Sequence, residues 1–188
     1  QIGSIAVRVL SFRDVQIDAD FWAARLQSAW DMRTAIGLIG RQDNNMFRLV
    51  HGEGDNLPGL IIDCYGDTAV MQAHSVGMHL VKNDICEALV KVSGGAISSV
   101  YYKSETTLPF KADVDHDNGF IYGSTGSDVA MENGLRFHID WLKGQKTGWT
   151  FCSQYVLLHR WLLRLRNAWR RKACPFCRQQ RQGCRTYQ

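Results

Sequence analysis

Apolar residues recur at helical spacing in two stretches of the chain. A helix is expected to begin at Asp18, because an Asp at the N-cap position accepts a hydrogen bond from a free backbone N–H. Gly37 or Gly40 is expected to end it. Its apolar or small residues are Trp22, Leu26, Ala29, Trp30 and Ile36. The same spacing predicts a second helix over residues 78–92, ended by Gly94 and Gly95.

Short apolar runs between turn residues predict strands. The expected strands are residues 5–12, 46–50, 60–63, 68–74, 97–103, 119–122, 129–131 and 135–141. The second helix has an apolar face of Leu80, Val81, Ile85, Ala88, Leu89 and Val92. This order of elements predicts an α+β fold in which that helix packs on a mainly antiparallel sheet.

Composition is that of a folded globular protein. Of 188 residues, 45% are hydrophobic and 11% aromatic, whereas disordered chains are poor in such residues. No apolar run approaches the roughly 18 residues that span a bilayer, and residues 1–15 do not resemble a signal peptide. Because the first residue is Gln1 rather than Met, we expect the chain to begin inside a longer, cytoplasmic protein. Its six Cys are then thiols or metal ligands rather than disulfides.

Charge is distributed unevenly along the chain. The formal net charge of +4 divides into −5 over residues 1–150 and +9 over residues 151–188. The second stretch holds nine basic residues and no Asp or Glu, although globular domains normally mix the two signs. The net charge of residues 1–150 therefore does not by itself attract phosphate groups.

Three segments carry the candidate chemistry: residues 47–63 (FRLVHGEGDNLPGLIID), 132–137 (ENGLRF) and 143–148 (KGQKTG). In the first, Glu53, Asp55 and Asp63 are hard oxygen ligands, but their spacing does not match an EF-hand, so no metal site is predicted. The third looks like a phosphate-binding loop only superficially. When its Lys–Thr pair is aligned, the two glycines that such a loop requires fall at Asp140 and Gln145.

In this order and at this spacing, the three segments resemble the S-adenosylmethionine-dependent 23S ribosomal RNA cytosine-C5 methyltransferases. The resemblance covers about residues 3–148. That family joins an N-terminal PUA domain, a central α+β domain and a C-terminal Rossmann-like methyltransferase domain. Its third segment continues into an aromatic pair and Asp-Gln-Arg, whereas this chain departs from the pattern at Trp149.

The resemblance implies a division of the chain. Residues 1–17 match the last strand of the PUA-like domain, and residues 18–40 match its linker helix. Residues 41–142 match the central α+β domain, and residues 143–148 match the start of the methyltransferase domain. Residues 149–188 are then an aberrant basic tail, and the Rossmann-like domain is essentially missing.

The resemblance also implies functional residues and partners. A Cys thiolate attacks the cytosine ring in the family, but this Cys lies downstream of residue 188, so no catalytic residue is assigned and Cys64 and Cys86 are expected to be packing residues. The cofactor-side positions carried over are Gln145, Lys146 and Thr147. Candidate contacts to ribosomal RNA are Arg8, Arg25, Arg33, Arg41 and Arg48, with solvated surface charges as the alternative. The family suggests a homodimer, and no membrane contact is expected.

The tail lacks the features of a cofactor site. A Rossmann-like site needs a strand, a Gly-rich turn and a helix, but residues 151–188 contain a single Gly and no acidic residue for a ribose hydroxyl. Residues 154–188 can be back-translated with suitable synonymous codons, and this DNA can then be read one nucleotide later. The shifted frame encodes a sequence with the pattern strand, TGGF turn, helix, strand and Asp, which resembles the family's first cofactor motif. We therefore expect a frameshift from about residue 149, with a short deletion, and a fragment that is inactive and does not bind S-adenosylmethionine.

Other interpretations of the tail stay open. Cys174 and Cys177, with Cys152 and Cys184, have thiolates suited to zinc, but the spacing fits no standard knuckle. A redox Cys-Pro-Phe-Cys lacks a preceding thioredoxin-like strand. One helical face gathers Trp161, Leu162, Leu165, Ala168 and Trp169 beside several Arg, and such a basic amphipathic helix suits RNA or a membrane surface. The alternative function is therefore a stand-alone RNA-binding or interaction module that uses this Arg/Trp tail.

Overall fold

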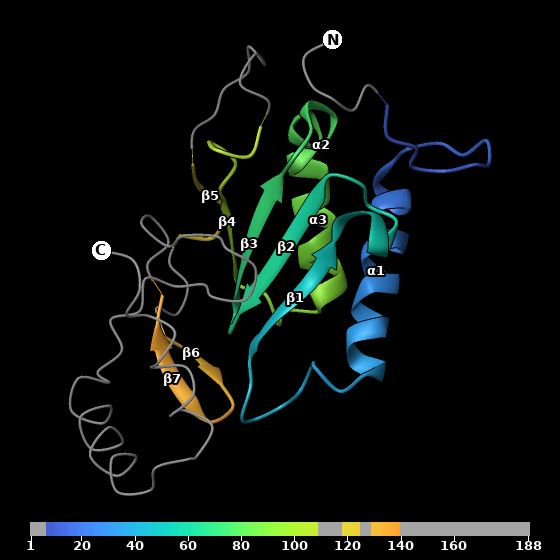
Figure 1. Ribbon diagram of the computed structural model, residues 1–188. Coiled ribbons are helices and arrows are strands. Elements are labelled where there is room, and N and C mark those ends of the chain that lie inside the picture. Colours follow the sequence, from blue (N-terminus) through green and yellow to red (C-terminus); the bar gives the residue numbers. More distant parts are fainter. Residues whose placement is uncertain (1–6, 109–117, 125–128, 140–188) are drawn as a thin grey trace, which may run out of the picture. The chain divides into compact units, whose positions relative to one another are not determined.

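The computed structural model describes residues 7–108, 118–124 and 129–139 (Figure 1). The helices are α1 (Ala19–Ala35), the 3₁₀ helix η1 (Gly52–Asp55), α2 (Val76–Leu80) and α3 (Lys82–Ser93). The strands are β1 (Met46–His51), β2 (Leu60–Tyr65), β3 (Thr68–Ala73), β4 (Ser99–Tyr102), β5 (Gly119–Tyr122), β6 (Val129–Glu132) and β7 (Leu135–His138). The fold is thus a mixture of helices and strands, as predicted.

The main sheet has five strands in the order β1-β2-β3-β4-β5. Three of its four neighbouring pairs are antiparallel, and β3 and β4 run parallel. Parallel neighbours need a crossover between them, and helices α2 and α3 supply it. The mainly antiparallel sheet is confirmed, and β6 and β7 form a separate antiparallel hairpin.

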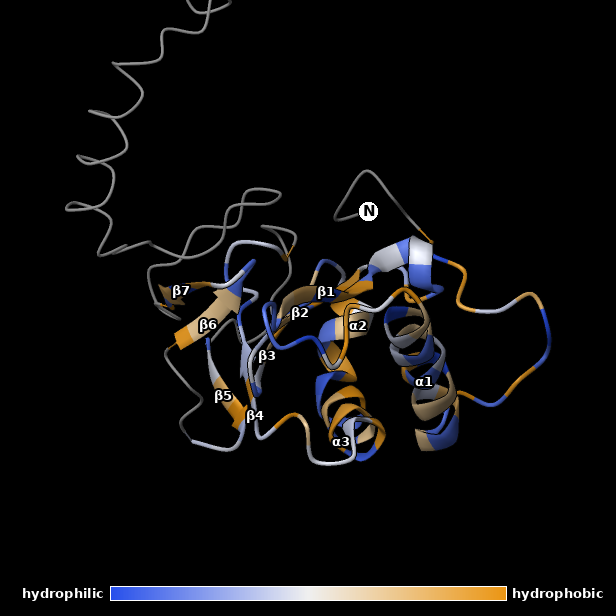
Figure 2. Ribbon diagram, turned by 90° about the horizontal axis from the view of Figure 1, so that it is seen from below, coloured by the Kyte–Doolittle hydropathy of each residue, from blue (hydrophilic) through white to orange (hydrophobic). Residues whose placement is uncertain are grey.

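Each face of the main sheet has its own apolar cluster. Helices α1 and α3 cover one face, and hairpin β6–β7 lies against the other (Figure 2). The larger cluster includes Trp22, Leu26, Leu49, Val50, Ile62, Met71, Ile85, Leu89 and Tyr102. The smaller cluster comprises Tyr65, Val70, Tyr101, Ala130 and Ile139. The buried residues of α1 therefore belong to the same core as those of α3 and the sheet.

Local interactions set both ends of α1. The Asp18 carboxylate accepts a hydrogen bond from Phe21 N at 2.9 Å. At the other end, Leu38 N donates to Arg33 O at 2.9 Å and Gly37 N donates to Thr34 O at 3.0 Å. This bonding pattern is a Schellman motif, which needs a left-handed residue, and Gly37 supplies it with φ 72°. The predicted start at Asp18 is confirmed, and of the two predicted ends, Gly37 and Gly40, the helix uses Gly37.

The predicted helix over residues 78–92 forms as two helices. The Ser75 hydroxyl accepts a hydrogen bond from Met78 N at 3.3 Å and so starts α2 early. Val81, with φ −101° and ψ 16°, leaves helical geometry and separates α2 from α3. This break turns Leu80 outward, where it is 70% exposed, so its predicted place on the apolar face is wrong. Gly94 ends α3 as predicted.

The prediction of a strand over residues 5–12 is wrong for residues 7–12, which are the part of it that the structure describes. Residues 7–12 are irregular, and Val7 and Phe12 are 75% and 99% exposed. A strand requires a hydrogen-bonded neighbour, and none of the described strands pairs with this segment.

Ile36, expected on the buried face of the first helix, is 62% exposed because it lies in the C-cap. The other expected strands form with small shifts of their ends, and residues 140–141 lie outside the described part.

None of the helices in the described ranges is both long enough and apolar enough to cross a membrane.

Leu26→Ala is expected to lower the free energy of unfolding by about 2–5 kcal/mol, because the Leu26 side chain of α1 is fully buried in the larger apolar cluster. Met32→Ala on the same helix is the matched control. Met32 is 55% exposed, so its loss should stay within about 0.5 kcal/mol. Urea unfolding measures both values. Equal, small losses in the two variants would contradict the packing of α1 into the core.

Candidate nucleic-acid interface

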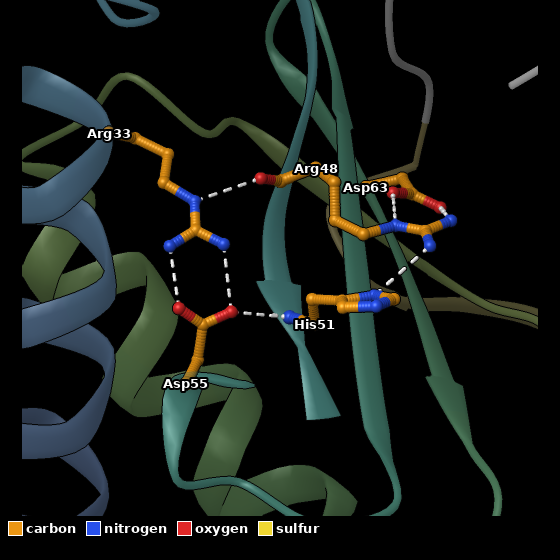
Figure 3. A network of polar contacts seen from close by, with 5 residues as sticks. All are labelled: Arg33, Arg48, His51, Asp55 and Asp63. Carbon is orange, nitrogen blue, oxygen red and sulfur yellow. Dashed lines mark hydrogen bonds and ion pairs between the residues drawn. The ribbon is translucent and has the colours of Figure 1, made fainter. Parts of the chain in front are cut away.

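A β-bulge in β1 arranges the polar residues of the candidate site. The register of β1 against β2 shifts between Arg48 and Val50, and both Leu49 and Val50 are fully buried. An extra residue in a strand lets two consecutive side chains occupy one face. Arg48 and His51, three residues apart, therefore both point to the opposite face, where Asp63 of β2 also lies (Figure 3).

Arg48 is held in place by a carboxylate on the neighbouring strand. Its Nε and Nη2 donate to the two Asp63 carboxylate oxygens at 2.7 and 3.1 Å. Its Nη1 lies 3.3 Å from His51 Nδ1. Hydrogen bonding to Asp63 raises the pKa of Arg48 above its ordinary value. Because Asp63 is only 7% exposed, Arg48 supplies the donors that this buried carboxylate requires.

A second bidentate pair joins α1 to η1. Arg33 Nη1 and Nη2 donate to the Asp55 carboxylate oxygens at 2.5 and 2.7 Å. Arg33 Nε also donates to Arg48 O at 3.1 Å, and His51 N donates to Asp55 Oδ2 at 2.6 Å (Figure 3). The two side chains are 12% and 8% exposed. The Arg33/Asp55 pair is thus a buried contact that ties α1, β1 and η1 together.

The other three candidate arginines contact different groups. Arg8 Nε lies 3.7 Å from a Glu53 carboxylate oxygen. Arg25 donates from Nη2 to Leu10 O at 2.9 Å, and its guanidinium lies 5.1 Å from the ring centre of Phe21. The structure therefore brings Arg33 and Arg48 into one network and leaves Arg8 and Arg25 outside it.

Arg41 forms an exposed pair with a neighbour in sequence. Its Nε and Nη2 donate to the Asp43 carboxylate at 2.9 and 2.7 Å. These hydrogen bonds raise the pKa of Arg41 and lower that of Asp43. A guanidinium has five N–H donors, so those not directed at Asp43 are available to a phosphate.

The acidic residues of the first motif are committed to arginines. Asp55 and Asp63 each accept two hydrogen bonds from a guanidinium, which neutralises the charge that a cation would need. Within the ranges that the structure describes, no group of three or more His, Cys, Asp or Glu side chains could hold a metal ion.

Cys64 and Cys86 are both buried and free of disulfides. Burial raises the pKa of Cys86 to about 11 and raises the pKa of Cys64 further. A nucleophilic cysteine needs thiolate character near neutral pH, which neither residue has. Both lie in the larger apolar cluster, so their predicted role as packing residues is confirmed.

The amino-acid sequence alone did not indicate the role of His51 or the two bidentate pairs. Arg33 and Asp55 are 22 positions apart, and Arg48 and Asp63 are 15 apart, so no local spacing rule relates them. The only available signal was the density of turn residues after His51. The predicted cofactor-side residues Gln145, Lys146 and Thr147 lie outside the described residues, as does the tail.

Curated relatives match most of this chain but only part of their own length. The chain is 34% identical over 148 residues to "Ribosomal RNA large subunit methyltransferase I" of Tolumonas auensis. It is 34% identical over 146 residues to the protein of the same name in Vibrio cholerae. Each alignment covers 77% of this chain and 36% of the relative. This chain therefore spans about a third of the length of these relatives. No protein-family profile matches the sequence.

Two solved structures share the fold. A proposed SAM-dependent methyltransferase from Streptococcus mutans has a TM-score of 0.59 at 19% identity and covers 76% of this chain and 34% of that chain. A proposed methyltransferase complexed with SAH has a TM-score of 0.59 at 18% identity and covers 83% of this chain and 37% of that chain. At these identities the likeness concerns the fold.

Arg48→Met is expected to lower the free energy of unfolding by about 1–3 kcal/mol, because the variant leaves the buried Asp63 carboxylate without two donors. Arg41→Met is the matched control, since it removes the same group from an exposed pair, and the loss should be smaller than that of Arg48→Met. Thermal and urea unfolding compare the two. A loss for Arg48→Met no larger than that of the control would mean that solvent, rather than Arg48, satisfies Asp63.

Proposed function

We propose that this chain is part of an S-adenosylmethionine-dependent methyltransferase that modifies cytosine C5 in large-subunit ribosomal RNA. The observation that carries the proposal is the 34% identity over 148 residues to proteins named as ribosomal RNA large subunit methyltransferases. The common fold with methyltransferase structures, at a TM-score of 0.59, supports it. The choice of cytosine C5 rests on the three sequence motifs, in particular residues 47–63.

The described residues act in this proposal as a scaffold and an RNA-facing surface rather than as a reaction centre. The two cysteines in these ranges are buried thiols with raised pKa values. Among the five candidate arginines, Arg41 and Arg48 suit phosphate best, because their side chains are 41% and 31% exposed while that of Arg33 is 12% exposed. Arg33 serves the fold instead.

The cofactor side of the proposal concerns residues 143–188. Gln145, Lys146 and Thr147 would border the S-adenosylmethionine pocket, but residues 151–188 offer one Gly and no acidic residue with which to build it. We infer that the chain of 188 residues neither binds the cofactor nor transfers a methyl group. A stand-alone RNA-binding module that uses the tail is the second candidate, favoured by the tail's net charge of +9.

The coding DNA tests the proposed enzyme. If a frameshift separates residue 148 from the cofactor domain, the alternative frame should encode the TGGF turn. A gene restored to that frame should yield a protein that binds S-adenosylmethionine in calorimetry and places 5-methylcytosine in large-subunit ribosomal RNA, as read by mass spectrometry. The unaltered chain is the control and should do neither. Methylation at another atom would contradict the cytosine-C5 assignment, and a coding sequence with no such frame would contradict the frameshift.

An RNA-binding titration over a series of salt concentrations separates the two candidates. For the stand-alone module we expect tight, steeply salt-dependent binding that Arg164→Gln, Arg170→Gln and Arg171→Gln weaken together, because each charge that contacts a phosphate releases a counterion. For the methyltransferase fragment we expect weak binding that these changes leave nearly unaltered and that Arg41→Gln and Arg48→Gln reduce. Filter binding to a large-subunit ribosomal RNA fragment measures both sets.

A further inference from the structure

Strand β1 is at one edge of the five-stranded sheet that the described residues form. An edge strand presents unpaired backbone N–H and C=O groups, which another strand can use for pairing. The sequence of β1, MFRLVH, is rich in apolar residues, so an open edge here would be well suited to strand addition. The question is what occupies the free side of β1.

Two outward backbone groups of β1 are bonded to side chains rather than to a neighbouring strand. At the end of β1, Arg48 O accepts from Arg33 Nε at 3.1 Å and His51 N donates to Asp55 Oδ2 at 2.6 Å. Figure 3 shows both bonds on the side of β1 that faces α1, away from β2. One guanidinium and one carboxylate thus take the donor and acceptor positions that a further strand would offer.

Asn45, directly before β1, is bonded to hairpin β6–β7 rather than to the Arg33/Asp55 pair. Asn45 N donates to Met131 O of β6 at 2.9 Å, and Met131 N donates to the Asn45 side-chain oxygen at 2.6 Å. These bonds join the hairpin to the start of β1 beside the β2–β3 turn, and the segment from Arg48 to His51 is the part of the edge that the Arg33/Asp55 pair covers.

The burial of this pair also argues for a role other than stability. Removing two charges from water costs free energy that their attraction only partly returns, and hydrophobic replacements of such pairs are often neutral or stabilising. We propose that the Arg33/Asp55 pair is an autoinhibitory contact, which closes the free edge of β1 against antiparallel pairing with β1 of a second copy of this chain. The proposal is independent of the methyltransferase assignment.

A second copy is the partner that this edge fits. The opened segment includes an acceptor, Arg48 O, and a donor, His51 N. Two antiparallel copies related by a two-fold axis can exchange these groups reciprocally, so that each acceptor meets the donor of the other copy. The arrangement is self-complementary and requires no other sequence.

The test replaces the pair while keeping the core apolar. Arg33→Met with Asp55→Leu in the full chain removes both bonds to the β1 backbone. Arg41→Met with Asp43→Leu is the matched control, since it makes the same change of charge and composition at an exposed pair that bonds only side chain to side chain. Light scattering during size-exclusion chromatography gives the mass, and hydrogen exchange locates the contact.

We call the Arg33→Met/Asp55→Leu chain the core variant. We expect it to fold and to double its mass relative to the parent chain as its concentration is raised. The amides of residues 46–51 should gain protection over the same range, whereas the control variant should keep the parent's mass. A folded core variant with the parent's mass at every concentration would overturn the proposal. So would association without a change in the exchange of β1.

A charge reversal separates edge closure from simple ion pairing. Arg33→Glu with Asp55→Arg keeps opposite charges but reverses donor and acceptor, so Arg48 O would face a carboxylate and His51 N a guanidinium. We expect this variant to double its mass as well. Retention of the parent's mass in the folded reversed variant would show that ion pairing alone suffices, and failure of both variants to fold would assign the pair to stability. Either result contradicts the proposal.

Discussion

The ion pair of Arg33 and Asp55 is the polar contact that ties the edge of the main sheet to α1 and η1. It joins the last turn of α1 to η1, and through two further hydrogen bonds it fixes the backbone of β1 at Arg48 and His51. These four bonds fix η1 after β1 and cover the edge of the sheet, while the buried apolar side chains of α1 hold that helix against the core.

The bulge in β1 makes this arrangement compatible with a close-packed core. By burying Leu49 and Val50 together, it adds apolar side chains to the face covered by α1 and α3. It also places Arg48 and His51 on the opposite face, where Arg48 reaches Asp63. One irregular residue in the strand thus places the apolar side chains of this segment on one face of the sheet and its polar side chains on the other.

The same contacts change how the arginines relate to function. A basic residue in sequence indicates a candidate for RNA contact, but a guanidinium that is itself buried in an ion pair cannot reach a phosphate. Arg33 illustrates this limit, because its three donating nitrogens are all used within the chain. Arg41 keeps its exposure, since its partner Asp43 lies two positions away on the surface.

Local sequence determined the elements that local chemistry controls: the start of α1 at Asp18, its end at Gly37, most strands and the α+β class. It also supplied the motifs that the methyltransferase proposal uses. Only the tertiary structure decided the bulge, the division of the predicted second helix at Val81 and the pairing of Arg33 with Asp55. Capping and periodicity act over a few residues, whereas these features depend on groups that meet through packing after long separations in sequence.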